Sequence, residues 1–258
     1  MRRLVALCLL GLSLSFGLSE EAAAQRPSRA AAETFRLEPQ RPGETDVYIL
    51  SFGLWGPQSV FESEARGAAR VLEGTFASNG RSIVRSNTKR RAGANAATLM
   101  AASRAVGRVL DPGQDVALVV LTSHGAPEGL GLVGPREAGV LTPRDVGALL
   151  DAAGARYRIL VVSACYSGVF ADALADPRTL VITAAAADRS SFGCRDGATW
   201  TYFGDAFFNQ SLRSERRLDA AFARARNLVT QREKREGFEP SNPQIAGGAL
   251  VLEHLAKR

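Results

Sequence analysis

The stretch Asp115-Val-Ala-Leu-Val-Val-Leu-Thr122, followed at once by Ser123-His124-Gly125, decides the fold class. Its apolar run lacks the polar alternation of a half-exposed strand, which is typical of a central strand covered on both faces. The stretch Tyr157-Arg-Ile-Leu-Val-Val-Ser163 has the same character. Two such strands predict a parallel sheet that is buried between layers of helices.

Further helices and strands alternate on both sides of these two segments. We expect strands at 46–52, 81–86 and 179–184 and a last one within 240–252, and helices at 59–79, 96–110, 142–153, 201–212 and 218–235, with a short helix after Ser163. Thr142-Pro143 supplies a capping residue and a favoured first residue for one of these helices. The Gly-rich segment 125–140 predicts a small hairpin. This order predicts an α/β fold, with one mostly parallel sheet of about six strands and helices on both faces.

The first 24 residues have the pattern of a secretory signal peptide. Arg2-Arg3 precedes the apolar run Leu4–Leu18, and Ala22-Ala-Ala24 offers a cleavage site of small residues. The run is 15 residues long, whereas a membrane span needs about 20, although an uncleaved N-terminal anchor stays open. We therefore expect an exported protein, periplasmic or secreted, with no stable membrane insertion after cleavage. Residues 25–45 are expected to form a flexible lead-in, and 46–258 the folded domain.

Composition and charge exclude several classes of protein. The chain of 258 residues carries a net charge of +6, and 46% of its residues are hydrophobic. These values are ordinary for a globular protein and exclude bulk disorder. The basic residues are scattered, apart from Lys89-Arg90-Arg91, and no aromatic residues interleave with them. We therefore predict a solvated basic surface and no nucleic-acid partner.

Two residues with reactive side chains follow the two buried strands. His124 closes the first strand and precedes a glycine, and Cys165 follows the second. Because ligands bind at the carboxyl ends of parallel strands, both side chains are expected at one edge of the sheet. Taken alone, His124 could equally be a hydrogen-bonded structural residue in a tight loop.

Cys165 also has alternative interpretations. Cys8 leaves with the signal peptide, and in an oxidising compartment the remaining Cys165 and Cys194 suggest a disulfide. A small core residue is the other alternative. Against the core, Ser167-Gly168 opens a turn directly after the cysteine. A position near a helix N-terminus would favour the thiolate.

The two strand ends together resemble the caspase-like cysteine peptidases, and within them the short exported bacterial branch of the legumain family. The resemblance runs from about Asp46 to Gly248. The stretches that carry it are Ser163-Ala-Cys-Tyr-Ser-Gly168, Thr183-Ala-Ala-Ala-Ala-Asp-Arg-Ser-Ser-Phe-Gly-Cys194 and Thr201-Tyr-Phe-Gly-Asp205. It implies a caspase-like three-layer sandwich.

The resemblance also implies an activity, that of a cysteine endopeptidase acting on peptides or proteins through a thioester intermediate, without a metal or cofactor. His124 and Cys165 take the catalytic positions, and the backbone N–H groups of Gly125 and Cys165 form the oxyanion hole. Ser190, Ser191 and Asp205 fall at the S1 pocket. A carboxylate there favours Asn or a basic residue at P1.

The chain departs from the family pattern at several positions. Ser163 stands where an acidic residue is usual two positions before the cysteine, and Ser123 stands where Asp usually precedes the histidine. The family's Arg for Asn selectivity, and its Asn that orients the histidine, have no clear counterpart around Gln58–Phe61. A catalytically silent peptide-binding domain on the same fold, or a transamidase, are the alternative functions.

Overall fold

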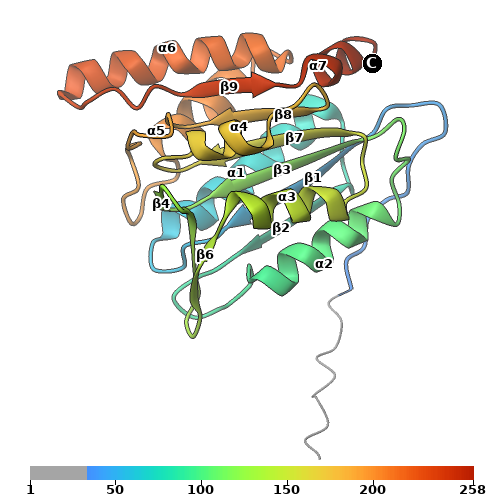
Figure 1. The fold of residues 1–258 in the computed structure, drawn as a ribbon, viewed down its shortest axis with the longest axis horizontal. Coiled ribbons are helices and arrows are strands. Elements are labelled where there is room, and N and C mark those ends of the chain that lie inside the picture. Colours follow the sequence, from blue (N-terminus) through green and yellow to red (C-terminus); the bar gives the residue numbers. More distant parts are fainter. Residues whose placement is uncertain (1–33) are drawn as a thin grey trace, which may run out of the picture. The chain divides into compact units, whose positions relative to one another are not determined.

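A six-stranded sheet forms the centre of the computed structural model, which describes residues 34–258 (Figure 1). The strand order is β2-β1-β3-β7-β8-β9, and every pair is parallel except β8 with β9. The strands are β1 (Val47–Gly53), β2 (Ser82–Ser86), β3 (Val116–Thr122), β7 (Tyr157–Ser163), β8 (Thr179–Thr183) and β9 (Gln244–Gly247). The expected α/β fold with a mostly parallel sheet is confirmed.

Helices cover both faces of this sheet because the central strands are apolar on both sides. Along β1, Tyr48, Leu50 and Phe52 pack into one core, whereas Val47 and Ile49 pack into the other. One face is covered by α2 (Ala96–Gly107), α3 (Pro143–Ala152) and α4 (Gly168–Leu174), and the other by α1 (Ser59–Phe76), α6 (Leu218–Glu236) and α7 (Ala249–Ala256). Figure 1 shows α2 and α3 in front of the sheet and α1 behind it.

A second, three-stranded sheet begins immediately after His124. It consists of β4 (Gly125–Ala126), β5 (Gly129–Val133) and β6 (Ala138–Leu141), paired antiparallel in the order β4-β5-β6. The predicted hairpin in this region therefore has one strand more than expected. At its end Thr142 caps α3 with a reciprocal capping box, as the Thr-Pro pair predicts.

Two segments near the C-terminus differ from the expectation. The single strand expected within 240–252 is a short strand, β9, followed by α7, because Gly247 and Gly248 have φ of 66° and 70° and end the extended backbone. The helix expected at 201–212 is a short α5 (Tyr202–Gly204) that continues as the π-helix η1 (Asp205–Ser211).

The described part of the expected lead-in is attached to the domain. The backbone N–H of Glu38 donates to the Gly80 carbonyl at 2.9 Å, and Phe35 and Leu37 pack against the core. Ordered contacts therefore begin before the expected boundary at Asp46. The predicted signal peptide lies outside the described residues. Among residues 34–258, no helix is long and apolar enough to cross a membrane.

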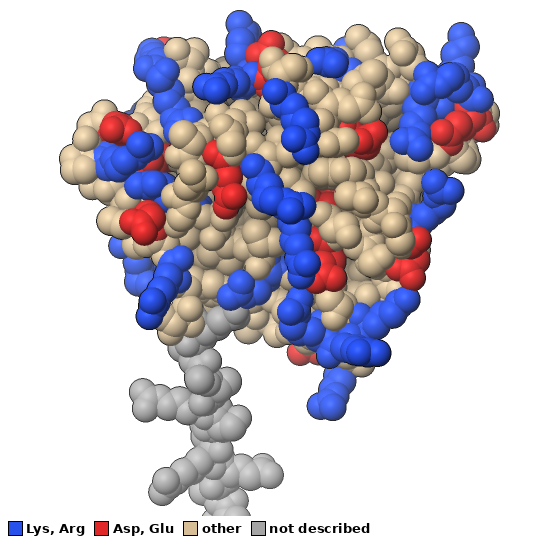
Figure 2. Space-filling view, turned by 180° about the vertical axis from the view of Figure 1, so that it is seen from behind, with Lys and Arg blue, Asp and Glu red and all other residues tan. Residues whose placement is uncertain are grey.

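The basic residues are distributed over the surface. On the face that Figure 2 shows, Lys and Arg side chains lie across the whole surface, with Asp and Glu between them. One example is Lys89, whose ammonium lies 2.9 Å from the exposed Asp196 carboxylate.

Candidate active site

The carboxyl ends of β3 and β7 place His124 and Cys165 at one edge of the sheet. The two strands pair in parallel register up to Thr122 and Ser163, so the histidine and the cysteine each follow two residues later. The Ser123 N–H donates to the Ser163 carbonyl at 3.2 Å and extends the pairing. The two reactive residues are therefore neighbours through strand register.

Gly125 lies against the backbone of Cys165. A Cβ atom at this glycine would lie 2.0 Å from the Cys165 carbonyl oxygen and 3.1 Å from the Ala164 side chain. No real Cβ fits at the first of these distances. Glycine after the histidine is thus required by the close approach of the two strand ends.

The Cys165 thiol contacts Ser191, which lies on the segment after β8. The Ser191 N–H donates to Sγ at 3.2 Å, and its hydroxyl lies 3.7 Å from the same atom. The next residue, Tyr166, has φ of 53°, and its N–H donates to the Arg189 carbonyl at 2.7 Å. A positive φ on a bulky side chain is unusual, and this bond holds the backbone of the turn after the cysteine.

Cys165 and Cys194 are both free thiols in the structure, and both are partly buried. The structure therefore contains no disulfide between Cys165 and Cys194, which was one of the alternatives suggested by the sequence. Burial raises the pKa of the Cys194 thiol to about 12, and the nearby Cys165 and Glu64 add to the effect. Cys194 is therefore protonated at neutral pH.

The His124 ring is held by Gln58 and two aromatic rings. Its Nε2 is hydrogen-bonded to the Gln58 side-chain oxygen, and it meets Trp55 and Phe61 edge-on with centroids 4.8 and 5.1 Å away. The Gln58 Nε2 donates to the Cys194 carbonyl at 2.9 Å, so its oxygen must accept. The imidazole proton then lies on Nε2, and Nδ1 is left as an acceptor. Burial lowers the pKa of His124.

Gln58 is a site residue that the sequence did not reveal. It lies at the N-cap of α1 but makes no side-chain capping bond there. Glutamine is not among the favoured capping residues. The sequence signal that could have identified Gln58 is a polar residue at the start of a predicted helix that is not a favoured capping residue. The residue that orients His124 is therefore Gln58, in the region where no counterpart was expected.

The expected S1 residues are only partly brought together. Ser191 contacts the Cys165 thiol, and Ser190 is exposed. The Asp205 carboxylate accepts from the side chains of Asn209 at 2.8 Å and Gln210 at 2.7 Å. It lines a pocket of about 280 Å³ on the α6 side, whose lining residues do not include Cys165.

A family model, described as the Peptidase C13 family, matches residues 92–249. The chain belongs to this family. The matched range includes both His124 and Cys165, and membership indicates a cysteine-peptidase type of function. A search of the curated proteins finds no match.

A solved structure confirms the fold of this C13 family member. Caspase-1 from Spodoptera frugiperda is 13% identical, and the alignment covers 83% of this chain and 94% of that one, with a TM-score of 0.53. At this identity the likeness concerns the fold alone. The predicted caspase-like architecture is confirmed.

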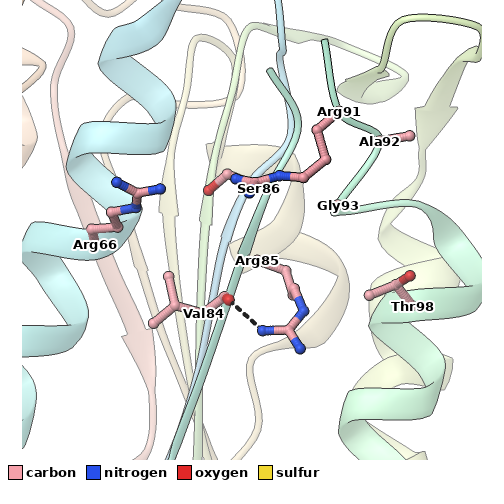
Figure 3. A pocket seen from close by; sticks show the side chains of 8 residues that line it. All are labelled: Arg66, Val84, Arg85, Ser86, Arg91, Ala92, Gly93 and Thr98. Carbon is pink, nitrogen blue, oxygen red and sulfur yellow. Dashed lines mark hydrogen bonds between the residues drawn. The ribbon is translucent and has the colours of Figure 1, made fainter. Parts of the chain in front are cut away.

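A basic pocket of about 390 Å³ lies apart from these residues, between α1, β2 and α2. Figure 3 shows Arg66, Arg85 and Arg91 around it. Arg66 and Arg91 both pair with the same carboxylate, Glu62, at 2.6 and 3.2 Å. None of the predicted site residues lines this pocket.

Proposed function

We propose that this protein is a cysteine endopeptidase in which Cys165 is the nucleophile and His124 the acid–base catalyst. The observation that carries the proposal is the placement of both residues directly after two register-paired strands. Membership in the C13 family supports the same chemistry.

The proposed reaction begins at the Cys165 sulfur. His124 Nδ1 takes the thiol proton, and Sγ attacks the scissile carbonyl carbon. The N–H groups of Gly125 and Cys165 receive the oxyanion, a kind of contact worth about 3–4 kcal/mol. Collapse of this intermediate forms a thioester and breaks the peptide C–N bond, and His124 gives its proton to the leaving amine. Water activated by His124 then hydrolyses the thioester and restores the thiol.

The surroundings of His124 suit the role of a base. Its lowered pKa keeps the imidazole neutral near neutral pH. The bond from Nε2 to Gln58 fixes the tautomer that leaves Nδ1 able to accept a proton.

For specificity, we propose Asn, Lys or Arg at P1, recognised by Ser190, Ser191 and Asp205. A carboxylate can accept from an amide or pair with a cation. Asp205 accepts from the side-chain amides of Asn209 and Gln210 in the structure, so recognition of a P1 side chain requires that the substrate displace at least one of them. A scan of P1 in short peptides tests this, and preferred cleavage after Asp would overturn it.

We also propose that the protein is exported, because residues 1–24 have the pattern of a cleaved signal peptide. The mass of the mature N-terminal peptide from periplasm and culture medium tests this. A mature chain that retains Met1–Ala24 would contradict it.

The central experiment compares wild type and Cys165→Ala on a peptide library, with iodoacetamide labelling of the folded protein to locate the reactive thiol. Cys194→Ala is the matched control. We expect cleavage to be lost only in Cys165→Ala, and equal cleavage by all three proteins refutes the assignment. An added amine nucleophile distinguishes hydrolysis from transamidation by the mass of the product. A wild type that binds peptides without cleaving them would indicate the silent binding domain.

A further inference from the structure

A buried carboxyl group lies at the end of β3, next to the segment that carries His124. Glu64, in the second turn of α1, has no exposed surface. The Thr122 hydroxyl donates to its Oε1 at 2.7 Å, and the Thr201 N–H donates to its Oε2 at 2.7 Å. Both of these partners are uncharged. Burial of a carboxyl group is costly unless its hydrogen bonds are satisfied, so these contacts account for its presence there.

These contacts link the ends of the two strands that carry His124 and Cys165. Thr122 is the last residue of β3. Ser163, the last residue of β7, shares a hydrogen bond of 3.0 Å with the Thr201 hydroxyl. One carboxyl group on α1 is therefore bonded directly to one strand end and connected through Thr201 to the other.

Gly204 packs closely against the carboxyl group. A Cβ atom at Gly204 would lie 2.0 Å from the Glu64 Oε2. The Gly204 N–H donates to the Thr201 hydroxyl at 2.9 Å, which holds the turn over the carboxyl group. These bonds join the turn, α1 and the two strand ends to one another.

We propose that Glu64 is a positioning residue, whose carboxyl group sets the spacing of His124 and Cys165 by bonding the end of β3 and, through Thr201, the end of β7. The inference rests on the proposed function, since the spacing matters only if the two residues react together. A misplacement of about 1 Å in a catalytic group can cost about a hundredfold in rate.

The protonation state of Glu64 suggests which variants separate its contacts from its charge. Burial raises the pKa of Glu64, and the nearby Ser163 hydroxyl and the hydrogen bonds from Thr122 and Thr201 oppose the effect. A glutamine side chain has the shape of a carboxyl group but carries no charge. Glu64→Gln keeps an acceptor for the Thr201 N–H and a donor toward the Thr122 hydroxyl, whereas Glu64→Met keeps the length and removes both bonds.

A second buried glutamate provides the matched control. Glu233 on α6 is 2% exposed and accepts from the Ser241 N–H at 3.1 Å. It makes no contact with the strand ends described above. Glu233→Met therefore removes a buried carboxyl group that has one bonded oxygen, Oε2, and one oxygen without a partner among the described residues, Oε1, and it leaves the ends of β3 and β7 unchanged.

The experiment measures thermal stability, kcat, KM and the rate at which iodoacetamide alkylates Cys165 in the full chain, for wild type, Glu64→Gln, Glu64→Met and Glu233→Met. For Glu64→Met we expect a kcat at least about tenfold lower, a KM within about threefold of wild type, and an altered alkylation rate. Glu64→Gln should restore kcat to within about threefold of wild type. Glu233→Met should lose stability but keep kcat and the alkylation rate.

An unchanged kcat and alkylation rate in Glu64→Met, or equal losses of kcat in Glu64→Met and Glu233→Met, would overturn the proposal. If Glu64→Met does not fold, Thr122→Val removes one of the two direct bonds at constant shape. An unchanged kcat and an unchanged alkylation rate in that variant would likewise overturn it. If the wild type cleaves no peptide, the proposed function fails by itself, and the alkylation rates still decide the role of Glu64.

Discussion

Two buried carboxyl groups at opposite ends of the central sheet, those of Asp46 and Glu64, are bonded in different ways. At the amino end, the Asp46 carboxylate lies 2.7 Å from Nη2 of Arg41 and 3.2 Å from Nε of Arg81. At the carboxyl end, Glu64 accepts from the Thr122 hydroxyl and the Thr201 N–H, neither of which carries a charge. Asp46 is therefore paired with cations, whereas Glu64 has neutral donors. Asp115, also buried at the amino end, resembles Glu64 in this respect, because it accepts from the N–H groups of Asp46 and Asp111 at 2.8 and 2.7 Å.

The two carboxyl groups also differ in what lies near them, because Glu64 is bonded to the residue two positions before His124. At the amino end, Asp46 and its two arginine partners lie at the opposite end of the strands from His124 and Cys165. At the carboxyl end, a guanidinium beside Glu64 would extend its field to His124 and Cys165 and shift their pKa values. Neutral donors hold the backbone there without adding a positive charge. Substitutions at the amino end should thus affect stability, and those at the carboxyl end activity.

His124→Ala is the variant with the largest expected effect at the carboxyl end. Loss of the acid–base group should lower kcat at least about 1,000-fold. Thermal stability should change little, because the His124 side chain is only partly buried. Steady-state rates on a peptide cleaved by the wild type, and a thermal melt, measure the two effects. A variant that retains a tenth of the wild-type kcat would contradict the assignment.

Asp46→Asn should show the opposite behaviour at the other end of the sheet. The Asp46 side chain is 1% exposed and that of Arg81 is 9% exposed, so the substitution leaves a buried cation without its partner. We expect a loss of about 3 kcal/mol in the free energy of unfolding, with kcat unchanged. Urea denaturation measures this loss. Glu44→Gln, at an exposed partner of Arg41, is the control and should cost far less.

Gln58→Leu tests the carboxyl end at a residue that does not itself react. It removes the bond that orients His124 at nearly constant volume. We expect kcat to fall about 10- to 100-fold, with KM and stability close to wild type. Steady-state kinetics and a thermal melt measure these quantities. A Gln58→Leu variant with wild-type kcat would show that Trp55 and Phe61 orient the ring without help.

The pKa of His124 offers a pH-dependent test. Burial lowers this pKa, so the wild-type imidazole should titrate below its ordinary value of about 6.5. Gln58→Glu places a carboxylate beside the ring and should raise the midpoint by about one unit or more. NMR of the imidazole protons against pH measures both, with His254, stacked on Tyr157, as the internal reference. A His124 titration midpoint in Gln58→Glu that is equal to or below that of the wild type would contradict the contact between residue 58 and the His124 ring.

Arg41→Met should give the smallest effect. Arg41 bonds Asp46 through both Nε and Nη2, but its side chain is 41% exposed. Solvent screens such a pair, so we expect a smaller loss of stability than in Asp46→Asn and no change in kcat. Urea denaturation beside Asp46→Asn checks the ranking. A larger loss of stability in Arg41→Met than in Asp46→Asn would contradict this ranking, because it would show that Arg41 contributes more to stability than Asp46 does.

Features that depend on a pattern within one strand or helix were predictable from the sequence. The apolar runs located β3 and β7 to within a residue, and parallel pairing then placed His124 and Cys165 at one edge. Family resemblance assigned their expected roles. These predictions depend on local hydrophobic periodicity and on strand topology, both of which are readable along the chain.

Contacts between distant segments could not be predicted in this way. Gln58 meets His124 across 66 positions, and Glu64 meets Thr201 across 137. Helical periodicity treats a polar residue as solvent-exposed, so a buried glutamate within α1 leaves no sign in the pattern. The hydrogen bonds of Asp205 within its own π-helix could not be predicted either, because the sequence of this segment is typical of an ordinary α-helix.

The strand order has a practical consequence for how this domain is delimited. β1 comes first in the chain yet lies between β2 and β3, whereas the family match begins at residue 92, after β1, α1 and β2. A fragment trimmed to the match would uncover the edge of β3, whose seven residues are all buried in the full chain, and such an edge promotes aggregation. The segment that matches the family model is thus shorter than the folded domain. Expression of the domain, or its transfer into another protein, must retain residues 34–91.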